Sequence, residues 1–313
     1  EKDVKKLLTM DIALEAVEEG FRQQSEGDAT NSPRLRLRLP NGDLNLMAAV
    51  APGFGVMGMK TYGVTSGNLT KFYMQLWSIE SGELIASMEA STLGQIRTGA
   101  ASGVATKYMS RKESSSVGVI GSGYQARTQL EAVCSVRDVR SVKVFSRTLA
   151  HMERFAAEMS SKIGVAILPV DSADACLDRS DIVITITNSS KPVLKGSCLI
   201  PGTHIVAAGS NHWMRRELDD EAVKRCDVVV VDDLDQAKIE CGDLIGLAKK
   251  GIIGWEGISD LSEVISGCVP GRTSDTDITL FESQGLALED VAVSVRVYEI
   301  AREIGIGQEL FLS

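Results

Sequence analysis

The stretch that decides the fold is Ser116-Val-Gly-Val-Ile-Gly-Ser-Gly-Tyr-Gln-Ala126, where a β-branched run ends in glycines and continues into helix-forming residues. In the pattern Gly121-x-Gly123-x-x-Ala126 the first glycine permits a tight turn, and the second lets the backbone approach a pyrophosphate. The small third position lets the helix pack closely on its strand. The pattern predicts a strand, a dinucleotide-binding turn and a helix, with cofactor contacts from Gly121, Ser122, Gly123, Tyr124, Gln125 and Ala126.

Strands and helices alternate after this turn. Short apolar strands are predicted at residues 116–120, 141–145, 165–170, 181–187, 204–208 and 227–231, with a last strand at 278–281. Near-continuous apolar strands separated by helices are typical of a parallel sheet covered on both faces. The fold class is therefore α/β, with a Rossmann-type doubly wound parallel sheet.

The N-terminal part has a different pattern of predicted secondary structure. Apolar residues at helical spacing predict a helix from Thr9 to about residue 24, and Arg and Leu alternate over 34–39 before a hairpin turn at Asn41-Gly42. A strand at 72–79 and a helix at 91–109 follow, and a long helix is expected at 287–304. We expect a smaller α+β domain at residues 1–113, completed by about 300–313, and a Rossmann domain at 114–299.

Composition narrows the possible partners. A net charge of −9 and a pI near 5 argue against a nucleic-acid-binding face. Six cysteines without a C-x-x-C pair indicate reduced core thiols of a cytoplasmic protein, and three histidines without ligand spacing indicate no metal. No apolar run reaches 18 residues and no signal peptide is evident, so no membrane partner is expected.

The end of the second strand bears on the choice of cofactor. An NAD site places a carboxylate there to bind the ribose 2′-hydroxyl, but this chain has Phe145-Ser146-Arg147-Thr148. A guanidinium with two neighbouring hydroxyls suits a 2′-phosphate. The sequence favours NADP(H) over NAD(H), with Ser146, Arg147 and Thr148 as ligands. The alternative is that Arg147 begins a solvated helix and either cofactor binds.

Several motifs occur in one order along the chain, and together they resemble the ornithine cyclodeaminase/mu-crystallin family. The resemblance runs from about residue 9 to 304. It implies a dimer-forming substrate domain, a Rossmann domain, and hydride transfer at the carbon bearing nitrogen in small amino or imino acids. The motifs are Ser32-Pro-Arg34, Gly58-Met-Lys-Thr-Tyr62, Gln95-Ile-Arg-Thr-Gly-Ala-Ala101, Val119-Ile-Gly-Ser-Gly123, Ala208-Gly-Ser-Asn211 with Arg216-Glu-Leu-Asp219, and the segment 274–285.

The resemblance also implies roles for individual residues. Arg34, Lys60 and Arg97 match the positions that hold the substrate carboxylate, and Lys60 is the expected proton relay beside an imine. From the residues alone, Arg34 could instead lie on a solvated strand face, Lys60 in a surface loop and Arg97 in a surface or ion-paired helix position. The remaining expected cofactor residues are Thr98, Thr187, Asn188 and Ser283.

Asn211 departs from the family pattern. The cyclodeaminases of the family have an aspartate at the matching position, and an asparagine cannot take up a proton as a base. It can still hydrogen-bond an amine or imine, so Asn211 is a candidate catalytic residue of a reductase. His212 and Trp213 follow it and could line the substrate pocket.

These features predict an NAD(P)H-dependent oxidoreductase acting on the C–N bond of a small amino or imino acid. A ketimine reductase or an alanine-dehydrogenase-like enzyme fits best, as a homodimer. Two alternatives stay open at this point: an ornithine cyclodeaminase-type ammonia lyase despite Asn211, and a small-molecule binding protein resembling mu-crystallin that holds NADPH.

Overall fold

The computed structural model describes residues 1–65 and 70–309, which form two compact units. Unit 1 comprises Glu1–Arg97 and Leu286–Ser313, and unit 2 comprises Thr98–Gly285. These boundaries lie inside helix α3 (Ser91–Met109) and just before helix α11 (Ala287–Glu303), rather than at 113 and 299. Residues 310–313 of the segment expected to complete the first domain lie outside the described residues.

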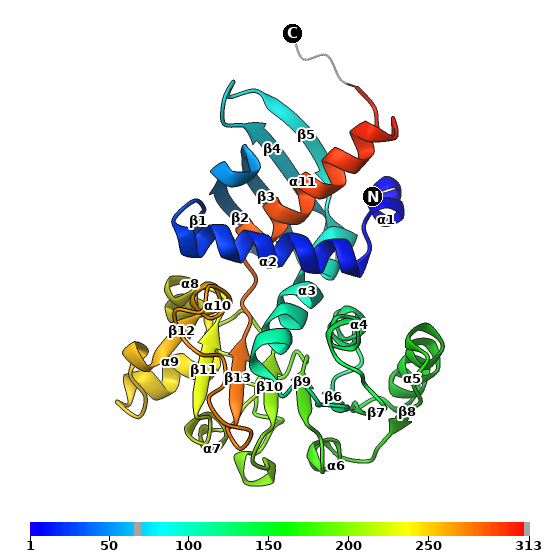
Figure 1. Ribbon diagram of the computed structural model, residues 1–313, viewed down its shortest axis with the longest axis vertical. Coiled ribbons are helices and arrows are strands. Elements are labelled where there is room, and N and C mark those ends of the chain that lie inside the picture. Colours follow the sequence, from blue (N-terminus) through cyan, green and yellow to red (C-terminus); the bar gives the residue numbers. More distant parts are fainter. Residues whose placement is uncertain (66–69, 310–313) are drawn as a thin grey trace. The chain divides into compact units, whose positions relative to one another are not determined.

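Unit 1 is a five-stranded antiparallel sheet in which the strands follow each other in chain order (Figure 1). Helices α2 (Met10–Glu26) and α11 pack on each other and cover one face of the sheet, and a short helix α1 (Lys2–Leu7) also contacts α11. Thr9 caps α2, since its hydroxyl accepts a hydrogen bond from Ile12 N at 3.3 Å. The strands are β1 (Thr30–Leu39), β2 (Gly42–Ala51), β3 (Val56–Thr65), β4 (Phe72–Ser78) and β5 (Leu84–Glu89).

The alternation in β1 is confirmed, but the arginines lie on the covered face and the leucines on the open one. Arg34 is buried and Arg36 half-buried, whereas Leu35 and Leu37 are 54% and 48% exposed. Arg38, near the end of the strand, is exposed. The interpretation of Arg34 as part of a solvated face is therefore wrong. In β1, unlike the neighbouring strands, the apolar residues point outward and the buried cation points toward the helices.

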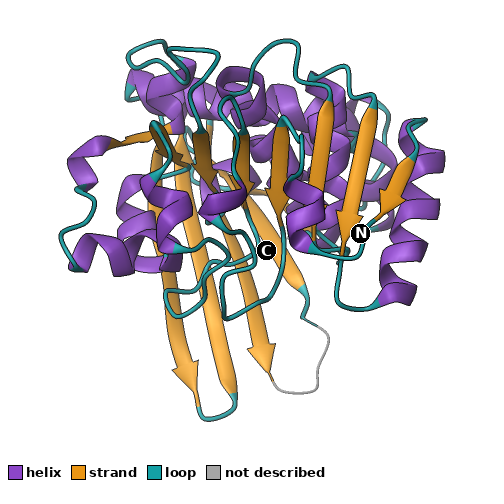
Figure 2. Ribbon diagram, turned by 90° about the horizontal axis from the view of Figure 1, so that it is seen from below, coloured by secondary structure: helices purple, strands orange, loops and turns teal. Residues whose placement is uncertain are grey.

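Unit 2 is an eight-stranded parallel sheet in the order β12-β11-β13-β10-β9-β6-β7-β8, and Figure 2 shows helices packed around it. The order reverses between β6 and β9, as in a doubly wound Rossmann fold. The predicted fold class is confirmed. The strands are β6 (Ser116–Ile120), β7 (Ser141–Phe145), β8 (Ile167–Pro169), β9 (Ile182–Thr185), β10 (His204–Ala207), β11 (Val228–Val231), β12 (Ile258–Asp260) and β13 (Thr279–Glu282).

The central strands of unit 2 form its core. The side chains of Val119, Ile184, Ile205 and Leu280 are buried, which explains why their strands read as continuous apolar runs. Strand β12 is an addition that the sequence pattern did not predict. The helices of this unit are α4 (Ala126–Val136), α5 (Leu149–Ile163), α6 (Ala173–Leu177), α7 (Asp220–Lys224), α8 (Leu234–Glu240), α9 (Gly242–Lys249) and α10 (Leu261–Ile265).

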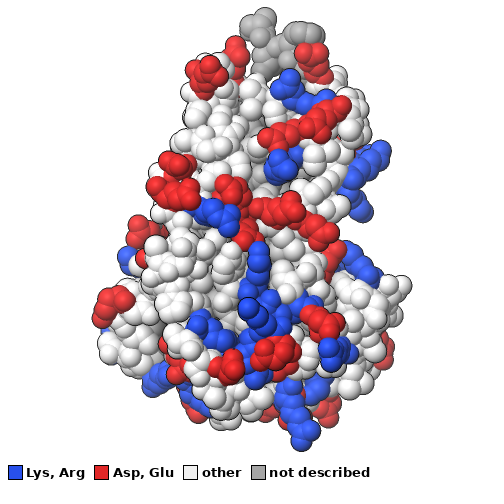
Figure 3. All heavy atoms as spheres, in the orientation of Figure 1, with Lys and Arg blue, Asp and Glu red and all other residues white. Residues whose placement is uncertain are grey.

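All six cysteines are free, but only Cys176 and Cys241 are buried and Cys268 is exposed, so the expectation of core thiols holds for part of the set. Acidic and basic side chains are interspersed on the face drawn in Figure 3. Within the described residues, no helix has the length and apolar character needed to span a bilayer.

Candidate active site

The glycine turn of unit 2 opens a cleft at the carboxyl ends of the central strands. Its volume is about 490 Å³, and it is lined by the residues that follow β6, β7, β9 and β10. This place, where the strand order reverses, is where open α/β sheets bind their ligands. The predicted cofactor residues found together in its lining are Gly121, Ser122, Gly123, Tyr124, Gln125, Ser146, Arg147, Thr148, Thr187 and Asn188.

Glycine stands at the two positions of the turn for different reasons. Gly121 has φ = +119°, and a Cβ there would lie 2.3 Å from the carbonyl oxygen of Ile186. A Cβ at Gly123 would have no neighbour within 4 Å, so its side faces open space. Gly121 is needed by the fold, whereas Gly123 leaves room for a group that approaches the backbone. This geometry fits the pyrophosphate of a dinucleotide.

The side chain of Arg147 gives the cleft a positive charge at its β7 end, where it is exposed. His151 lines the cleft beside it. Among the described residues that line the cleft there is no carboxylate. The arrangement offers a guanidinium and two hydroxyls, but no carboxylate, to a ribose 2′ substituent.

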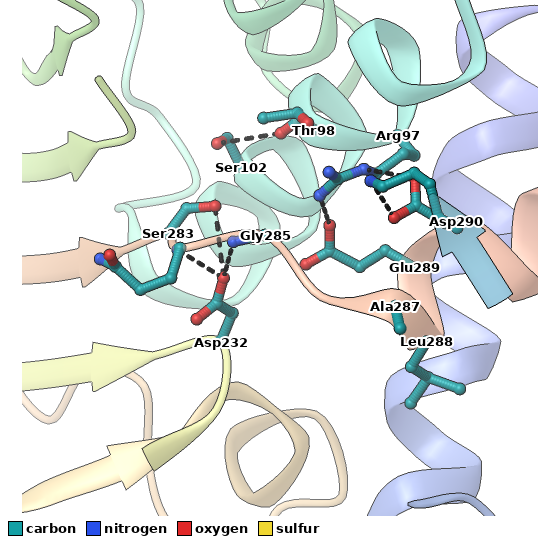
Figure 4. A network of polar contacts seen from close by, with 12 residues as sticks. Arg97, Thr98, Ser102, Asp232, Ser283, Gly285, Ala287, Leu288, Glu289 and Asp290 are labelled. Carbon is teal, nitrogen blue, oxygen red and sulfur yellow. Dashed lines mark hydrogen bonds and ion pairs between the residues drawn. The ribbon is translucent and has the colours of Figure 1, made fainter. Parts of the chain in front are cut away.

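Unit 1 contains a buried ionic cluster assembled from four elements. Lys60 of β3 donates to Asp290 of α11. Arg97 of α3 donates from Nε to Asp290 Oδ1 at 2.9 Å and from a terminal nitrogen to Glu289 Oε2 at 2.5 Å (Figure 4). Arg34 of β1 is also buried and acts electrostatically on Lys60. The structure thus brings together the three residues predicted to hold the substrate carboxylate.

Three features of the structure place the carboxylates of α11 in this cluster. The side chain of Asn31 in β1 accepts hydrogen bonds from Ala287 N at 3.0 Å and Leu288 N at 3.3 Å, which caps the first turn of α11. A Cβ at Gly58 would lie 2.7 Å from Val291 Cγ2, so a glycine is required where α11 crosses β3. Gly58 therefore lets α11 approach the strand that carries Lys60. The helix dipole favours Glu289 and Asp290 in its first turn.

Burial shifts the pKa values of two side chains in this cluster. The pKa of Lys60 falls from 10.5 to about 7, mainly because burial disfavours the ammonium, and the positive charge of Arg97 adds to the effect. Asp290 opposes the shift by stabilising the charged lysine. Burial likewise raises the pKa of Glu289, although Arg97 counteracts this. A lysine near neutrality in such a position can hold or release a proton under ordinary conditions.

Other predicted residues lie outside these two groups. Thr98 is in α3, and its carbonyl accepts a hydrogen bond from Gln129 of α4 at 3.1 Å. Ala126 is buried as the first residue of α4. Ser283 is buried at the end of β13, where its hydroxyl lies 3.5 Å from Asp232 Oδ2 (Figure 4). None of them lines the cleft as the described residues define it, and their cofactor contacts stay predictions.

Asn211 lies in the loop after β10, in unit 2, and is exposed. Gly209, two residues before it, lines the cleft. His212 and Trp213 follow with their rings stacked at a centroid distance of 6.1 Å, and Trp213 is 49% exposed. Lys60 and Asn211 thus belong to different compact units, and the catalytic role of both stays a prediction.

Sequence reasoning missed Glu289 and Asp290. Their partners lie far away in the chain, since Lys60 and Asp290 are 230 positions apart and Arg97 and Glu289 are 192 positions apart. One feature of the sequence points to them. Glu289 and Asp290 are two adjacent acids inside the otherwise apolar run 286–293, and carboxylates that such a run buries need cationic partners.

The comparisons with known proteins agree with this architecture. The model of the ornithine cyclodeaminase/mu-crystallin family matches residues 1–305. The alanine dehydrogenase of Archaeoglobus fulgidus is 39% identical over 99% of this chain and 96% of its own. The structure of Thermococcus litoralis Δ1-pyrroline-2-carboxylate reductase with NADH and L-proline has a TM-score of 0.94 and 36% identity, covering 99% of this chain and 98% of the other. An archaeal alanine dehydrogenase dimer with bound NAD has a TM-score of 0.94 and 37% identity, covering 100% and 98%.

Proposed function

This chain belongs to the ornithine cyclodeaminase/mu-crystallin family, and we propose that it is an NAD(P)H-dependent oxidoreductase that reduces a small 2-imino acid to the amino acid. The observation that carries the proposal is the buried ionic cluster around Lys60 and Arg97 in unit 1. The cleft at the glycine turn of unit 2 supports the same reading, because its shape and donors suit a dinucleotide.

The ionic cluster suits a substrate with a carboxylate. Its five buried side chains carry one more positive than negative charge when all are ionised, with the cations on Arg34, Lys60 and Arg97 and the anions on Glu289 and Asp290. Burying an excess charge is costly, and a bound carboxylate would remove the excess. The planar guanidinium of an arginine can also donate two parallel hydrogen bonds to a carboxylate and so fix its orientation. This holds the neighbouring carbon in place for reaction.

Lys60 is the proposed proton donor. The bound nicotinamide would supply a hydride to the imine carbon, and reduction of the C=N bond then requires one proton at nitrogen. Lys60, with its pKa lowered to about 7, holds such a proton at Nζ and can release it at neutral pH. The positive charges nearby favour this release, because they disfavour the charged ammonium relative to the neutral amine.

Asn211 favours reduction over cyclodeamination. An amide can hydrogen-bond the substrate nitrogen but cannot serve as the base that the aspartate of the cyclodeaminases provides. In this proposal Asn211 orients the imine, and ammonia release from ornithine is not the reaction.

The test is a screen of NADPH and NADH oxidation with Δ1-pyrroline-2-carboxylate, Δ1-piperideine-2-carboxylate and pyruvate plus ammonia, with ornithine assayed for ammonia release. We expect rapid turnover of at least one imino acid, at the 1–10³ per second typical of enzymes. Efficient conversion of ornithine to proline would contradict the proposal. Tight NADPH binding without turnover of any of these substrates would favour the binding-protein alternative.

We propose a preference for NADP(H), and Arg147 is its support. A charged hydrogen bond to phosphate is typically worth about 1.5–3 kcal/mol, so Arg147→Ala should remove most of a tenfold or larger preference for NADPH over NADH. The control is Arg140→Ala, which removes a mostly exposed arginine before β7 that pairs with Asp138 at 2.8 Å. Fluorescence titration of both cofactors measures the preference, and equal affinities in the wild-type protein would refute it.

We propose a homodimer formed through the open face of the sheet in unit 1. This face exposes large apolar side chains, and a dimer is present in the archaeal alanine dehydrogenase structure. Leu37→Lys should yield monomers in light scattering, while Ile304→Lys, a change at an exposed residue beyond α11, should leave the dimer intact. A wild-type monomer at micromolar concentration would contradict the proposal. The exposed residues are Leu35, Leu37, Leu39, Leu44, Val50 and Tyr73.

A further inference from the structure

Glu217, in the motif Arg216-Glu-Leu-Asp219, joins two loops of the cleft. It precedes α7, and its side chain is 1% exposed. Its Oε1 accepts hydrogen bonds from the backbone N and the hydroxyl of Thr187, both at 2.6 Å. Its Oε2 accepts from Gly209 N at 2.8 Å. Thr187 follows β9 and Gly209 follows β10, and both line the cleft.

The groups of Thr187 and Gly209 that hydrogen-bond the Glu217 carboxylate are all donors, and the side chain of Thr185 is a further donor beside it. A carboxylate is an acceptor at both oxygens, and bonds to it are stronger than bonds to a neutral amide oxygen. A glutamine in its place would turn an NH₂ group toward one of these donors. A Cβ at Gly209 would lie 2.4 Å from Glu217 Oε2, so the fit also requires glycine at that position.

The backbone of Glu217 is held from both sides. Its carbonyl accepts from Val193 N at 2.7 Å and Leu194 N at 2.9 Å, and Val193 also lines the cleft. Asp243 of α9 accepts from Glu217 N at 3.0 Å and from Leu218 N at 2.8 Å. The carboxylate therefore acts from a fixed point on the loops after β9 and β10.

We propose that Glu217 is a positioning residue for the cofactor, fixing the loops that receive the half of the dinucleotide beyond the pyrophosphate. This inference rests on the proposed dinucleotide site. Arg147 marks the adenosine end at β7, so the other half of the molecule extends across β9 and β10, on the far side of the switch point. Thr187, Val193 and Gly209 lie on that side, and all three are tied to Glu217.

The experiment compares Glu217→Gln with Asp219→Asn, a matched carboxylate-to-amide change in the same motif. Asp219 accepts from Gly196 N at 3.0 Å and Ala222 N at 2.8 Å, and neither residue lines the cleft. Each variant is titrated with NADPH and NADH and with adenosine 2′,5′-bisphosphate, which fills only the adenosine end. Urea unfolding reports any general loss of stability.

We expect Glu217→Gln to raise the Kd for the complete dinucleotides at least tenfold and to leave the Kd of adenosine 2′,5′-bisphosphate within twofold of the wild type. Asp219→Asn should leave both within twofold. Glu217→Asp, which keeps a carboxylate on a shorter chain, should fall between the wild type and Glu217→Gln, and it carries the comparison if Glu217→Gln does not fold.

Three results would decide against the inference or its premise. Unchanged dinucleotide affinity in both Glu217 variants would overturn it. An equal loss for the dinucleotide and the fragment would also overturn it, because that pattern indicates general disruption. Failure of the wild-type protein to bind any dinucleotide would instead refute the proposed function on which the inference rests.

Discussion

In unit 1 the candidate site consists of charged side chains that meet from β1, β3, α3 and α11, whereas in unit 2 it consists mainly of backbone turns at the ends of neighbouring strands. The first arrangement depends on particular functional groups, and the second depends on the absence of side chains at Gly121 and Gly209. Substrate chemistry and cofactor binding should therefore respond to different kinds of substitution. Changes of charge should impair turnover in unit 1, and an added methyl group should impair cofactor binding in unit 2.

The largest expected effect comes from Arg97→Met. This change removes the cation that bonds both Glu289 and Asp290, together with one proposed ligand of the substrate carboxylate. Losing a charged partner in a desolvated site commonly costs about 2–5 kcal/mol, or roughly 30-fold to several thousandfold in kcat/KM. NADPH affinity should change little, because Arg97 does not line the cleft at the glycine turn.

Steady-state kinetics of Arg97→Met measure kcat/KM, and cofactor titration measures its affinity for NADPH. Arg97→Lys, which keeps the charge, should lose less activity. A change in kcat/KM of less than threefold in Arg97→Met would mean that Arg97 is not a carboxylate ligand. A matching loss of NADPH affinity would mean that Arg97 does not serve substrate binding alone.

Substitutions at the two glycines of the turn test the cofactor cleft of unit 2. Gly121→Ala places a Cβ against the carbonyl of Ile186 at a residue with φ = +119°, and such strain costs about 1–3 kcal/mol of folding free energy. Gly123→Ala meets no neighbour within 4 Å and should leave stability almost unchanged. Both should weaken NADPH binding, the first through a distorted turn and the second by blocking the pyrophosphate. Urea unfolding with cofactor titration separates the cases, and full NADPH affinity in Gly123→Ala would show that no phosphate approaches that backbone.

The smallest expected effect is a shift in pH dependence. If protonated Lys60 is the donor, kcat/KM for imine reduction falls as the pH rises through its pKa of about 7. Asp290→Asn removes the anion that stabilises the charged lysine, so the inflection should move to lower pH. Glu299→Gln, at an exposed acid of the same helix, should not move it. A profile that Asp290→Asn leaves in place, or moves upward, would exclude Lys60 as the titrating group.

The two regions also differ in how much the sequence could predict. The patterns at β6, β7 and α3 gave the element bounds that the structure has, because strand and helix periodicity and the glycine turn are properties of neighbouring residues. The cofactor lining was mostly predictable for the same reason. The ionic cluster was only half predictable, since Glu289 and Asp290 reach Arg97 and Lys60 through the packing of α11 on the sheet.

Two further features show the same limit. The cap of α11 by Asn31 joins residues 256 positions apart, and no local pattern announces it. The arginine and leucine alternation in β1 shows which residues share a face, but the helices decide which face is covered. Here the covered face holds Arg34, against the usual preference for burying leucine.

The proposed role of the buried cluster in unit 1 is to bind the carboxylate of an amino or imino acid. A crystal structure of the protein with the oxidised cofactor and the amino acid product of its best substrate tests this role at the atomic level. We predict that the ligand carboxylate contacts Arg97 and Lys60, with Arg34 within hydrogen-bonding distance. A carboxylate bound elsewhere, with Arg97 and Lys60 contacting only Glu289 and Asp290, would rule out this role for the cluster.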